Sequence, residues 1–301
     1  MIPVKIFKNT PSFNFIKNAK LAFSGSVILI ILSIVLLFTK GLNIGIDFSG
    51  GILIEARFKE KSELKYLRNL LENKNLGEVS LQNIGSDKDV MIRIAKDSGS
   101  DHSQAQKVAY VKDILKKSYE NKIDFRRVDF VGPTIGEELI KSGIYALLLS
   151  FIAIMFYIWI RFSYQFGIGA IIALIHDAIL TFGFFSLTAL EFNLTSIAAI
   201  LTIIGYSIND SVVIFDRIRE NLRRYRSRAL SDILNISVNE TLSRTVLTAG
   251  TTILALLALV IFGGQVLQSF SLAVLFGVVI GTYSSIYIAA PILNRKKTKL
   301  I

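Results

Sequence analysis

The chain has 301 residues, of which 52% are hydrophobic, with no cysteine and a formal net charge of +11 at pH 7. The apolar residues form long blocks with the charges between them, which excludes a single soluble domain and indicates a membrane protein. The missing cysteines exclude disulfides and thiolate metal sites, and two histidines, His102 and His176, leave little material for a histidine-based metal site.

The first apolar block covers residues 21–39 and follows a basic N-terminus, residues 1–20, which we expect in the cytoplasm. Basic residues before an apolar block are also typical of signal peptides. This block is longer than the usual apolar core of a signal peptide, and no clear small-x-small cleavage pattern follows it. We therefore predict an uncleaved first membrane helix.

A polar segment, residues 41–142, separates the first block from the others, and its periodicity changes between that of strands and that of helices. The predicted elements are a strand at 51–58, a helix at 61–73, strands at 78–84 and 90–95 separated by Gly85–Ser86–Asp87, a helix at 103–119 and a strand at 123–131. This β-α-β-β-α-β order predicts a ferredoxin-like α+β domain, on the periplasmic side of the membrane. Its sequence has no glycine-rich phosphate loop and no nucleophile beside a base, so we expect it to contact another protein.

Five further apolar blocks follow, each near the ~20 residues that a helix needs to cross a bilayer. They cover residues 144–160, 166–187, 196–215, 246–262 and 269–293, which make a membrane domain at 143–293 before a basic cytoplasmic tail at 294–301. The predicted fold is a polytopic α-helical membrane protein with six transmembrane helices and a ferredoxin-like (βαββαβ) extracytoplasmic domain between the first two.

The short connections predict the orientation, because Lys and Arg favour the cytoplasmic side. Arginines are frequent at 216–244, Arg161 lies between the second and third spans, and the tail is basic. The connections near Glu191 and Gly263–Gly264 contain neither Lys nor Arg. Both termini are therefore predicted in the cytoplasm. This placement also explains the positive net charge better than nucleic-acid binding does.

The fourth span contains a carboxyl group, which is costly in hydrocarbon and therefore a functional candidate. Asp210 lies about four residues, or ~6 Å, from the cytoplasmic end of the apolar stretch. With Thr202, Tyr206, Asn209 and Val213 it follows three- and four-residue steps, so one face of this helix is mostly polar.

The fifth span begins with Arg244 and Thr245, followed by Thr248, Thr251 and Thr252. Because the two spans run antiparallel, we expect Asp210 and Arg244 at a similar depth. A carboxyl group held between a guanidinium and apolar surroundings can take up or release a proton when those surroundings change. A static Asp–Arg pair that joins two helices is the alternative.

Other polar and small residues lie inside the remaining spans. His176 and Asp177 in the third span are either a second polar station on an ion path or hydrogen-bonding groups between helices, and both interpretations stay open. Gly277 and Gly281 in the sixth span predict close helix packing.

Five segments resemble motifs of the SecD/SecF family, and together those of its SecF branch, over essentially the whole chain. They are Gly45–Gly51 (GIDFSGG), Val131–Leu139 (VGPTIGEEL), Gly205–Asn221 (GYSINDSVVIFDRIREN), Ser243–Thr252 (SRTVLTAGTT) and Gly281–Pro291 (GTYSSIYIAAP). The first segment is shared by both branches, whereas the fourth-span and sixth-span segments are more specific.

The resemblance implies a member of the proton-driven RND superfamily that works with SecD in the bacterial inner membrane. The complex would use the proton motive force, with sodium as the alternative coupling ion, to promote late stages of Sec-dependent preprotein translocation. The implied partners are SecD, the SecYEG channel, YajC, YidC and the translocating preprotein. The resemblance implies neither covalent chemistry nor a cofactor, and the sequence has no nucleotide-binding G-x-x-x-x-G-K-[ST] loop, so we do not expect an enzyme.

The resemblance also implies residue roles. Asp210 matches the family's proton-path aspartate, and Arg244 matches the arginine that begins the fifth span. From the polar residues themselves, and not from the resemblance, we expect Ser207, Asn209 and Thr248 to support this path with hydrogen bonds or bound water, with His176 and Asp177 as further supporting polar residues. Two alternatives remain: a small-molecule or lipid exporter of the RND type, which usually has twice as many spans, and a structural scaffold that holds SecD near the channel.

Overall fold

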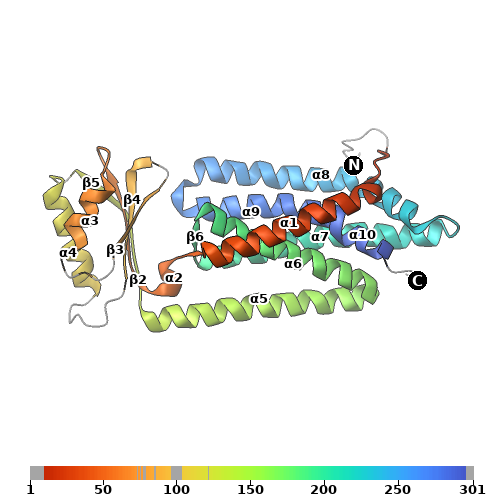
Figure 1. Ribbon diagram of the computed structural model, residues 1–301, viewed down its shortest axis with the longest axis horizontal. Helices are drawn as coiled ribbons and strands as arrows, with labels where there is room; N and C mark the ends of the chain where they lie inside the picture. Colours follow the sequence, from red (N-terminus) through yellow and green to blue (C-terminus); the bar gives the residue numbers. More distant parts are fainter. Residues whose placement is uncertain are drawn as a thin grey trace, which may run out of the picture. The chain divides into compact units, whose positions relative to one another are not determined.

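The computed structural model describes residues 10–72, 74, 76, 79–84, 86–95, 104–120 and 122–295. These residues form two compact units (Figure 1). The sheet unit is Ile44–Tyr145, and the membrane unit combines Met1–Asn43 with Ala146–Ile301. His102 and the basic residues after Arg295 lie outside the described part of the chain.

The sheet unit has the predicted β-α-β-β-α-β order. Its elements are β2 (Gly51–Phe58), α3 (Leu64–Glu72), β3 (Val79–Ile84), β4 (Ser86–Ile94), α4 (Gln104–Ser118) and β5 (Ile123–Val131), with the short helix α2 (Ile46–Ser49) in front. The strands pair antiparallel in the order β3-β4-β2-β5, and both longer helices lie on one face of the sheet (Figure 1). This arrangement confirms the ferredoxin-like domain.

The central strand β2 is buried on both faces except at Arg57, because the helices cover one face and α2 packs near the other. Leu67 and Leu71 of α3, with Val111 and Leu115 of α4, fill the space between helices and sheet. The leucine and valine spacing that predicts these two helices therefore describes their buried faces.

The turn before β4 differs from the prediction. Ser86 and Asp87 were expected in the turn, but β4 already begins at Ser86. The Ser86 hydroxyl donates to Asp89 Oδ2 at 2.6 Å, and Arg57 of β2 pairs with Asp89 at 2.9 Å. Turn-type residues thus enter the strand because their polar groups find partners within the sheet.

The GIDFSGG segment needs glycine at its end for a steric reason. Gly50 and Gly51 have φ values of +69° and +115°, which residues with a side chain rarely adopt. A Cβ atom on Gly51 would also lie 2.5 Å from the carbonyl oxygen of Ile94. The two glycines therefore let the chain leave α2 and pair at once with β4.

Within the described part of the chain, six helices are long and apolar enough to cross a membrane, as predicted. They are α1 (Phe15–Thr39), α5 (Pro133–Arg161), α6 (Tyr164–Thr188), α7 (Leu194–Arg224), α8 (Leu230–Phe262) and α9 (Gly264–Ser284), which continues through a π-helical turn η1 (Ser285–Ala289), α10 (Ala290–Ile292) and η2 (Leu293–Arg295). At least half of the apolar stretch of α6, α7 and α9 is buried, whereas α1, α5 and α8 are mostly exposed. The core of the membrane unit therefore lies between α6, α7 and α9.

Several helices extend beyond the predicted spans. The apolar block of the fourth span ends at residue 215, but α7 continues to Arg224, and α8 begins at Leu230, before the block at 246. Glu240 of α8 accepts hydrogen bonds from Arg217 at 2.7 Å and Asn221 at 2.6 Å, so polar pairing stabilises both extensions. Hydropathy reports only the apolar part of such helices.

Glycines let α7 and α9 approach closely, which confirms the prediction for the sixth span. A Cβ atom on Gly277 would clash with Ile203 of α7, and one on Gly281 would lie 3.0 Å from the Cβ atom of Ser207. This approach brings the hydroxyl groups of α7 and α9 within reach of α6.

Candidate functional site

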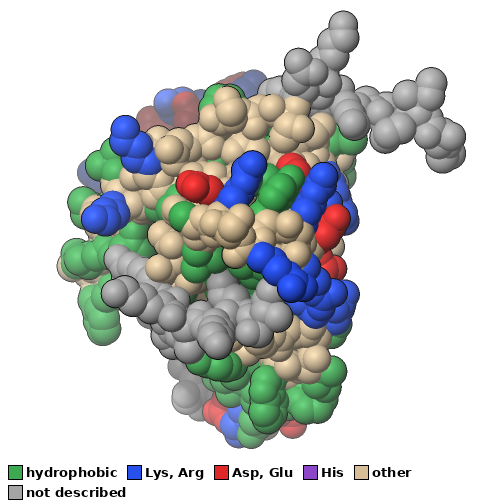
Figure 2. Space-filling view, turned by 90° about the vertical axis from the view of Figure 1, so that its right-hand side faces the viewer, with side chains coloured by type: hydrophobic (Ala, Val, Ile, Leu, Met, Phe, Trp, Pro, Cys, Tyr) green, Lys and Arg blue, Asp and Glu red, His purple; other side chains and the backbone are tan. Residues whose placement is uncertain are grey.

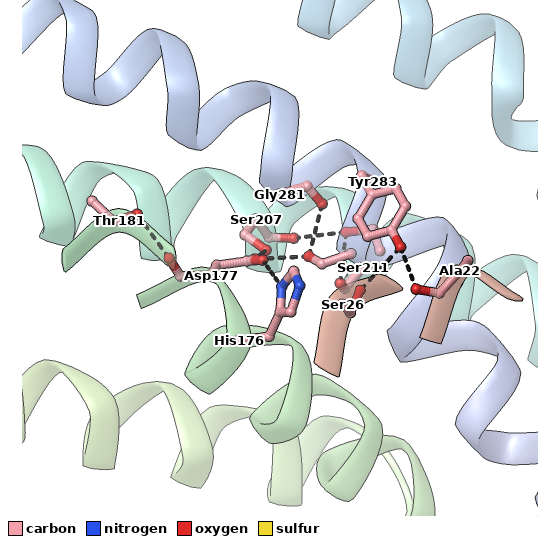
Figure 3. A network of polar contacts seen from close by, with 11 residues as sticks. Ala22, Ser26, His176, Asp177, Thr181, Ser207, Ser211, Gly281 and Tyr283 are labelled. Carbon is pink, nitrogen blue, oxygen red and sulfur yellow. Dashed lines mark hydrogen bonds and ion pairs between the residues drawn. The ribbon is translucent and has the colours of Figure 1, made fainter. Parts of the chain in front are cut away.

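A buried carboxylate lies at the centre of the membrane unit. Asp177 of α6 is fully buried, and its Oδ2 accepts hydrogen bonds from Ser207 of α7 at 2.6 Å and Ser284 of α9 at 2.7 Å. Its Oδ1 lies 2.8 Å from Nδ1 of the preceding His176 (Figure 3). His176, Asp177, Ser207 and Ser284, here the Asp177 cluster, therefore join three helices through one carboxylate.

Local geometry explains why these side chains meet. Gly281 faces Ser207, so α7 and α9 come together at this level. Ser284 lies one helical turn after Gly281 and also donates to the Gly281 carbonyl at 3.1 Å. Both serines consequently point to the same side, toward α6.

Further hydroxyl groups extend this network (Figure 3). Ser211 of α7 and Ser285 of η1 lie 2.9 Å apart, and Ser285 also donates to the Ser207 carbonyl at 3.2 Å. Tyr283 donates to the Ala22 carbonyl of α1 at 2.7 Å, and its oxygen lies 3.0 Å from Ser26 Oγ. The network meets the π-helical turn, a feature that is frequent at functional sites.

The predicted Asp210 lies one turn after Ser207 on α7, in a separate polar contact. It is buried, and its Oδ1 accepts a hydrogen bond from Thr245 of α8 at 2.7 Å. Its Oδ2 has no hydrogen-bond partner among the described residues. Among the described residues, only one oxygen of this carboxylate therefore has a hydrogen-bond partner.

Arg244 lies at the level expected from the sequence but does not pair with Asp210. Its side chain is exposed, and no ion pair links it to Asp210 in the part of the chain that the structure describes. Successive residues of an α-helix point about 100° apart. Because Thr245 faces α7, its neighbour Arg244 must face elsewhere.

The other predicted polar residues separate into different places. Ser207 belongs to the Asp177 cluster, together with His176 and Asp177. Asn209 is exposed, and the Thr248 hydroxyl donates to the carbonyls of Arg244 and Thr245 in its own helix. The supporting polar residues predicted on the fourth span are therefore divided, with Ser207 in the interior and Asn209 at the surface.

Sequence reasoning missed the role of Ser284 and of Thr245. Thr245 follows Arg244 directly in the sequence. The signal that could have distinguished them is their direction on the helix, because neighbouring residues point to different sides. Ser284 lies in the sixth-span segment as one of several small polar residues, with no local feature that distinguishes it from Ser285. Only the packing of α9 on α6 selects it.

Among the described residues, no group of three or more His, Asp or Glu side chains is arranged to hold a metal ion.

Comparisons with known families agree along the chain. Residues 110–299 match the family described as "Protein export membrane protein SecD/SecF, C-terminal", and residues 35–61 match the "SecD/SecF GG Motif". The second match contains Gly50 and Gly51, the two glycines at the passage from α2 to β2.

Full-length relatives and solved structures are also similar. The chain is 49% identical to the protein translocase subunit SecF of Rickettsia rickettsii, over 99% of this chain and 98% of that protein. It is 50% identical to the SecF subunit of Rickettsia bellii, over 97% and 96% of the two chains.

The crystal structure of SecDF from Thermus thermophilus, a translocon-associated membrane protein, matches with a TM-score of 0.86 and 36% identity. A structure of SecDF in a super-membrane-facing form matches with a TM-score of 0.71 and 35% identity. This chain is covered to 95% and 96% but spans only 39% of either SecDF chain. The two matched family segments, the full-length relatives and the shared architecture lead to one conclusion: the chain belongs to the SecF family of protein translocase subunits.

Proposed function

We propose that this chain is the SecF half of a SecDF complex that uses the proton motive force to promote late stages of Sec-dependent preprotein translocation. One observation carries the proposal. Asp210 is a buried carboxylate inside a membrane-spanning helix, and the described residues leave its Oδ2 without a hydrogen-bond partner. Such a group is costly in a membrane and is retained where an ion pathway needs it.

The energy of ion movement fits this role. One elementary charge that crosses ~100 mV releases ~2.3 kcal/mol. This energy changes the population ratio of two conformations by a factor of some tens. A proton that binds Asp210 removes the negative charge that Thr245 now stabilises. Proton binding therefore changes the contact between α7 and α8, and movement of these helices would follow. Sodium is the alternative coupling ion, since carboxylate and hydroxyl oxygens also bind it.

The exposed polar groups near Asp210 support a membrane partner. Asn209 of α7 and Arg244 of α8 are exposed, each next in sequence to a buried partner of the Asp210–Thr245 hydrogen bond. The exposed residues of α8 after Arg244 are mostly apolar. Polar groups in membrane helices usually face protein or water rather than lipid. SecD is the partner we propose for this face, because this chain accounts for only 39% of the matched SecDF chain. SecYEG, YajC, YidC and the preprotein are the further partners.

The charge distribution supports cytoplasmic termini. Figure 2 shows Lys and Arg side chains over the end of the membrane unit where α7 and α8 connect. Arg161, Arg219, Arg223 and Arg224 line a groove there with Asp216 and Glu220. The start of α1 and α10 lie at the same end (Figure 1). The positive-inside rule puts this end in the cytoplasm.

A scaffold role is the competing function, and the Asp210–Thr245 hydrogen bond favours it. The two functions separate in export of a secretory preprotein into vesicles that contain SecD, at equal abundance of the complex. Asp210→Asn keeps the side-chain size but cannot ionise. We expect this variant to lose the gradient-dependent part of export and to keep the ATP-driven part.

The matched control is Asp216→Asn, which makes the same charge change on the same helix at a half-exposed position. It should keep both parts of export. Unchanged gradient-dependent export with Asp210→Asn would reject the ion-path role and support the scaffold. An equal loss of gradient-dependent export in both variants would show that any lost negative charge on α7 has this effect, and that Asp210 has no special role.

A further inference from the structure

The strongest unassigned feature is an imidazole inside the membrane unit with one nitrogen left open. His176 is 2% exposed, and Nδ1 lies 2.8 Å from Asp177 Oδ1. No described residue provides a hydrogen-bond partner for Nε2. A buried polar atom without a hydrogen-bond partner lowers the stability of the fold, so such an atom is a candidate for a functional role.

The donors around Asp177 favour one hydrogen position on the ring. Asp177 Oδ2 accepts from Ser207 and Ser284, and an ionised carboxylate has no hydrogen to donate. Nδ1 is then the donor to Oδ1, as in other histidines oriented by a carboxylate. Nε2 consequently carries the free lone pair and is the atom that can accept a proton.

From these contacts we infer that His176 and Asp177, the His176–Asp177 dyad, form a second proton-binding site of the membrane unit, which takes up its proton at His176 Nε2. A hydronium ion transfers its proton to the Nε2 lone pair, so that one O–H bond breaks, one N–H bond forms and a water molecule is left. The Nδ1–H bond to Asp177 is retained. The dyad changes from a net charge of −1 to zero, since an imidazolium then faces the carboxylate. No other bond forms or breaks.

The net charge of the dyad is set by His176 and Asp177 themselves, as the residues on the neighbouring helices indicate. On α1, residues 22–33 contain no charged side chain, and Ser26 faces the network. On α9, Tyr283 lies near the imidazole, with ring centroids 6.2 Å apart, and the ring of Tyr287 of η1 packs at a tilt against Tyr283. On α7, the titratable neighbours of Ser207 are Tyr206 and Asp210, and Asp210 bonds to Thr245 of α8 instead.

The position of the dyad connects its charge to helix packing. Ser284 donates to Asp177 and is the last residue of α9 before the π-helical turn. Ser207 donates to the same oxygen and lies one turn before Asp210 on α7. A proton on His176 draws the carboxylate toward the imidazolium and weakens its hold on both serines. This site therefore acts on α7 and α9 independently of any ion that Asp210 binds.

The sequence permits a direct test, because His102 and His176 are the two histidines of the chain. In a His102→Gln background, the full chain labelled with ¹⁵N-histidine and placed in lipid nanodiscs reports on His176 alone. The ring nitrogen resonances are measured between about pH 5 and about pH 8, where an imidazole normally titrates. We expect Nδ1 to stay protonated throughout and Nε2 to change from unprotonated to protonated as the pH falls.

Two variants separate a proton site from a structural hydrogen bond. Asp177→Asn removes the negative charge, so half-protonation of Nε2 should need a proton concentration at least about tenfold higher. Thr181→Val is the matched control, because this buried hydroxyl donates only to the Asp177 backbone carbonyl, at 2.7 Å, and its loss should leave the titration unchanged.

An Nε2 resonance that does not change across the whole range would overturn the proposal. An Nδ1 without a proton would do the same, since Asp177 would then not orient the ring. Equal midpoints for the parent and Asp177→Asn would show that the two residues do not act as a dyad. The titration of the His102→Gln parent decides the matter even if Asp177→Asn does not fold.

Discussion

Thr245 Oγ1 donates a hydrogen bond to Asp210 Oδ1 at 2.7 Å, across the contact between α7 and α8. Both groups are buried, and the guanidinium of the preceding Arg244 lies on an exposed face of α8. The internal partner of the proposed ion-path carboxylate is therefore a hydroxyl group. The Arg244 guanidinium forms no hydrogen bond to Asp210 among the described residues.

We expect Thr245→Val to destabilise the chain, because it removes the described donor to Asp210. Hydrogen bonds between membrane helices contribute about 0.6 kcal/mol on average and up to about 1.7 kcal/mol, which sets the size of the loss. The measurement is the thermal unfolding midpoint in nanodiscs. Thr251→Val is the control, since Thr251 is exposed and its hydroxyl donates only within its own helix. Equal effects of the two variants would contradict a special role for the Asp210–Thr245 bond.

Gly277→Ala should also lower the unfolding midpoint, because the added methyl group would overlap with Ile203 of α7. Overpacking of this kind costs about 1–3 kcal/mol. Gly25→Ala on α1 is the matched control, because a Cβ atom there meets nothing within 4 Å. Ile203→Ala combined with Gly277→Ala should recover part of the loss, and a double variant worse than either single one would reject the steric explanation.

The sheet unit should lose stability in acid through Asp89. Burial raises the pKa of this carboxyl, but the Ser86 hydrogen bond and the charges of Arg57 and Arg126 outweigh it and hold the pKa below the ordinary value of 3.8. A folded-state pKa below the unfolded one means that the stabilisation is complete above the unfolded pKa and disappears as the pH falls through the folded pKa. Unfolding by urea, followed by circular dichroism at about pH 6 and at lower pH down to about pH 2, measures this loss.

Asp89→Asn should reduce the stability at about pH 6 and flatten its dependence on pH below about pH 4. Asp87→Asn makes the same charge change two residues away, where the ion pair with Lys61 is exposed on both sides. Exposed pairs contribute little, so this control should behave as wild type. An acid response that survives Asp89→Asn would assign it to other groups.

Asn239→Ala should release the segment before α1. The Asn239 amide accepts from the Phe13 backbone N–H at 2.9 Å and donates to the Phe13 carbonyl at 2.8 Å, as a neighbouring strand would. Loss of two hydrogen bonds, each contributing about 1 kcal/mol, should raise chymotrypsin cleavage after Phe13 about tenfold or more. Asn209→Ala, an exposed asparagine on another helix, should leave the cleavage rate unchanged. A rate that is the same in both variants would show that Asn239 does not hold the segment.

Much of the fold follows from local patterns. The strands β2 and β5 have the bounds predicted from alternation, because flanking turns and glycines limit them. The membrane helices follow from apolar length, which is sufficient where every backbone group must bond within its own segment. Their polar extensions did not follow, since Arg217, Asn221 and Glu240 stabilise each other across two helices and show no local signal.

The sequence by itself determined the family, the six membrane helices, the fold of the sheet unit and Asp210 as the candidate carboxylate. These features depend on composition, periodicity and motifs, which are properties of short stretches of the sequence. The tertiary structure decided which residues are partners. Ser284 meets Asp177 across 107 positions of the chain, and Thr245 rather than Arg244 meets Asp210. Helical phase and the close packing of α7 on α9 select these contacts, because a side chain can bond only to groups on the face toward which its helix turns it.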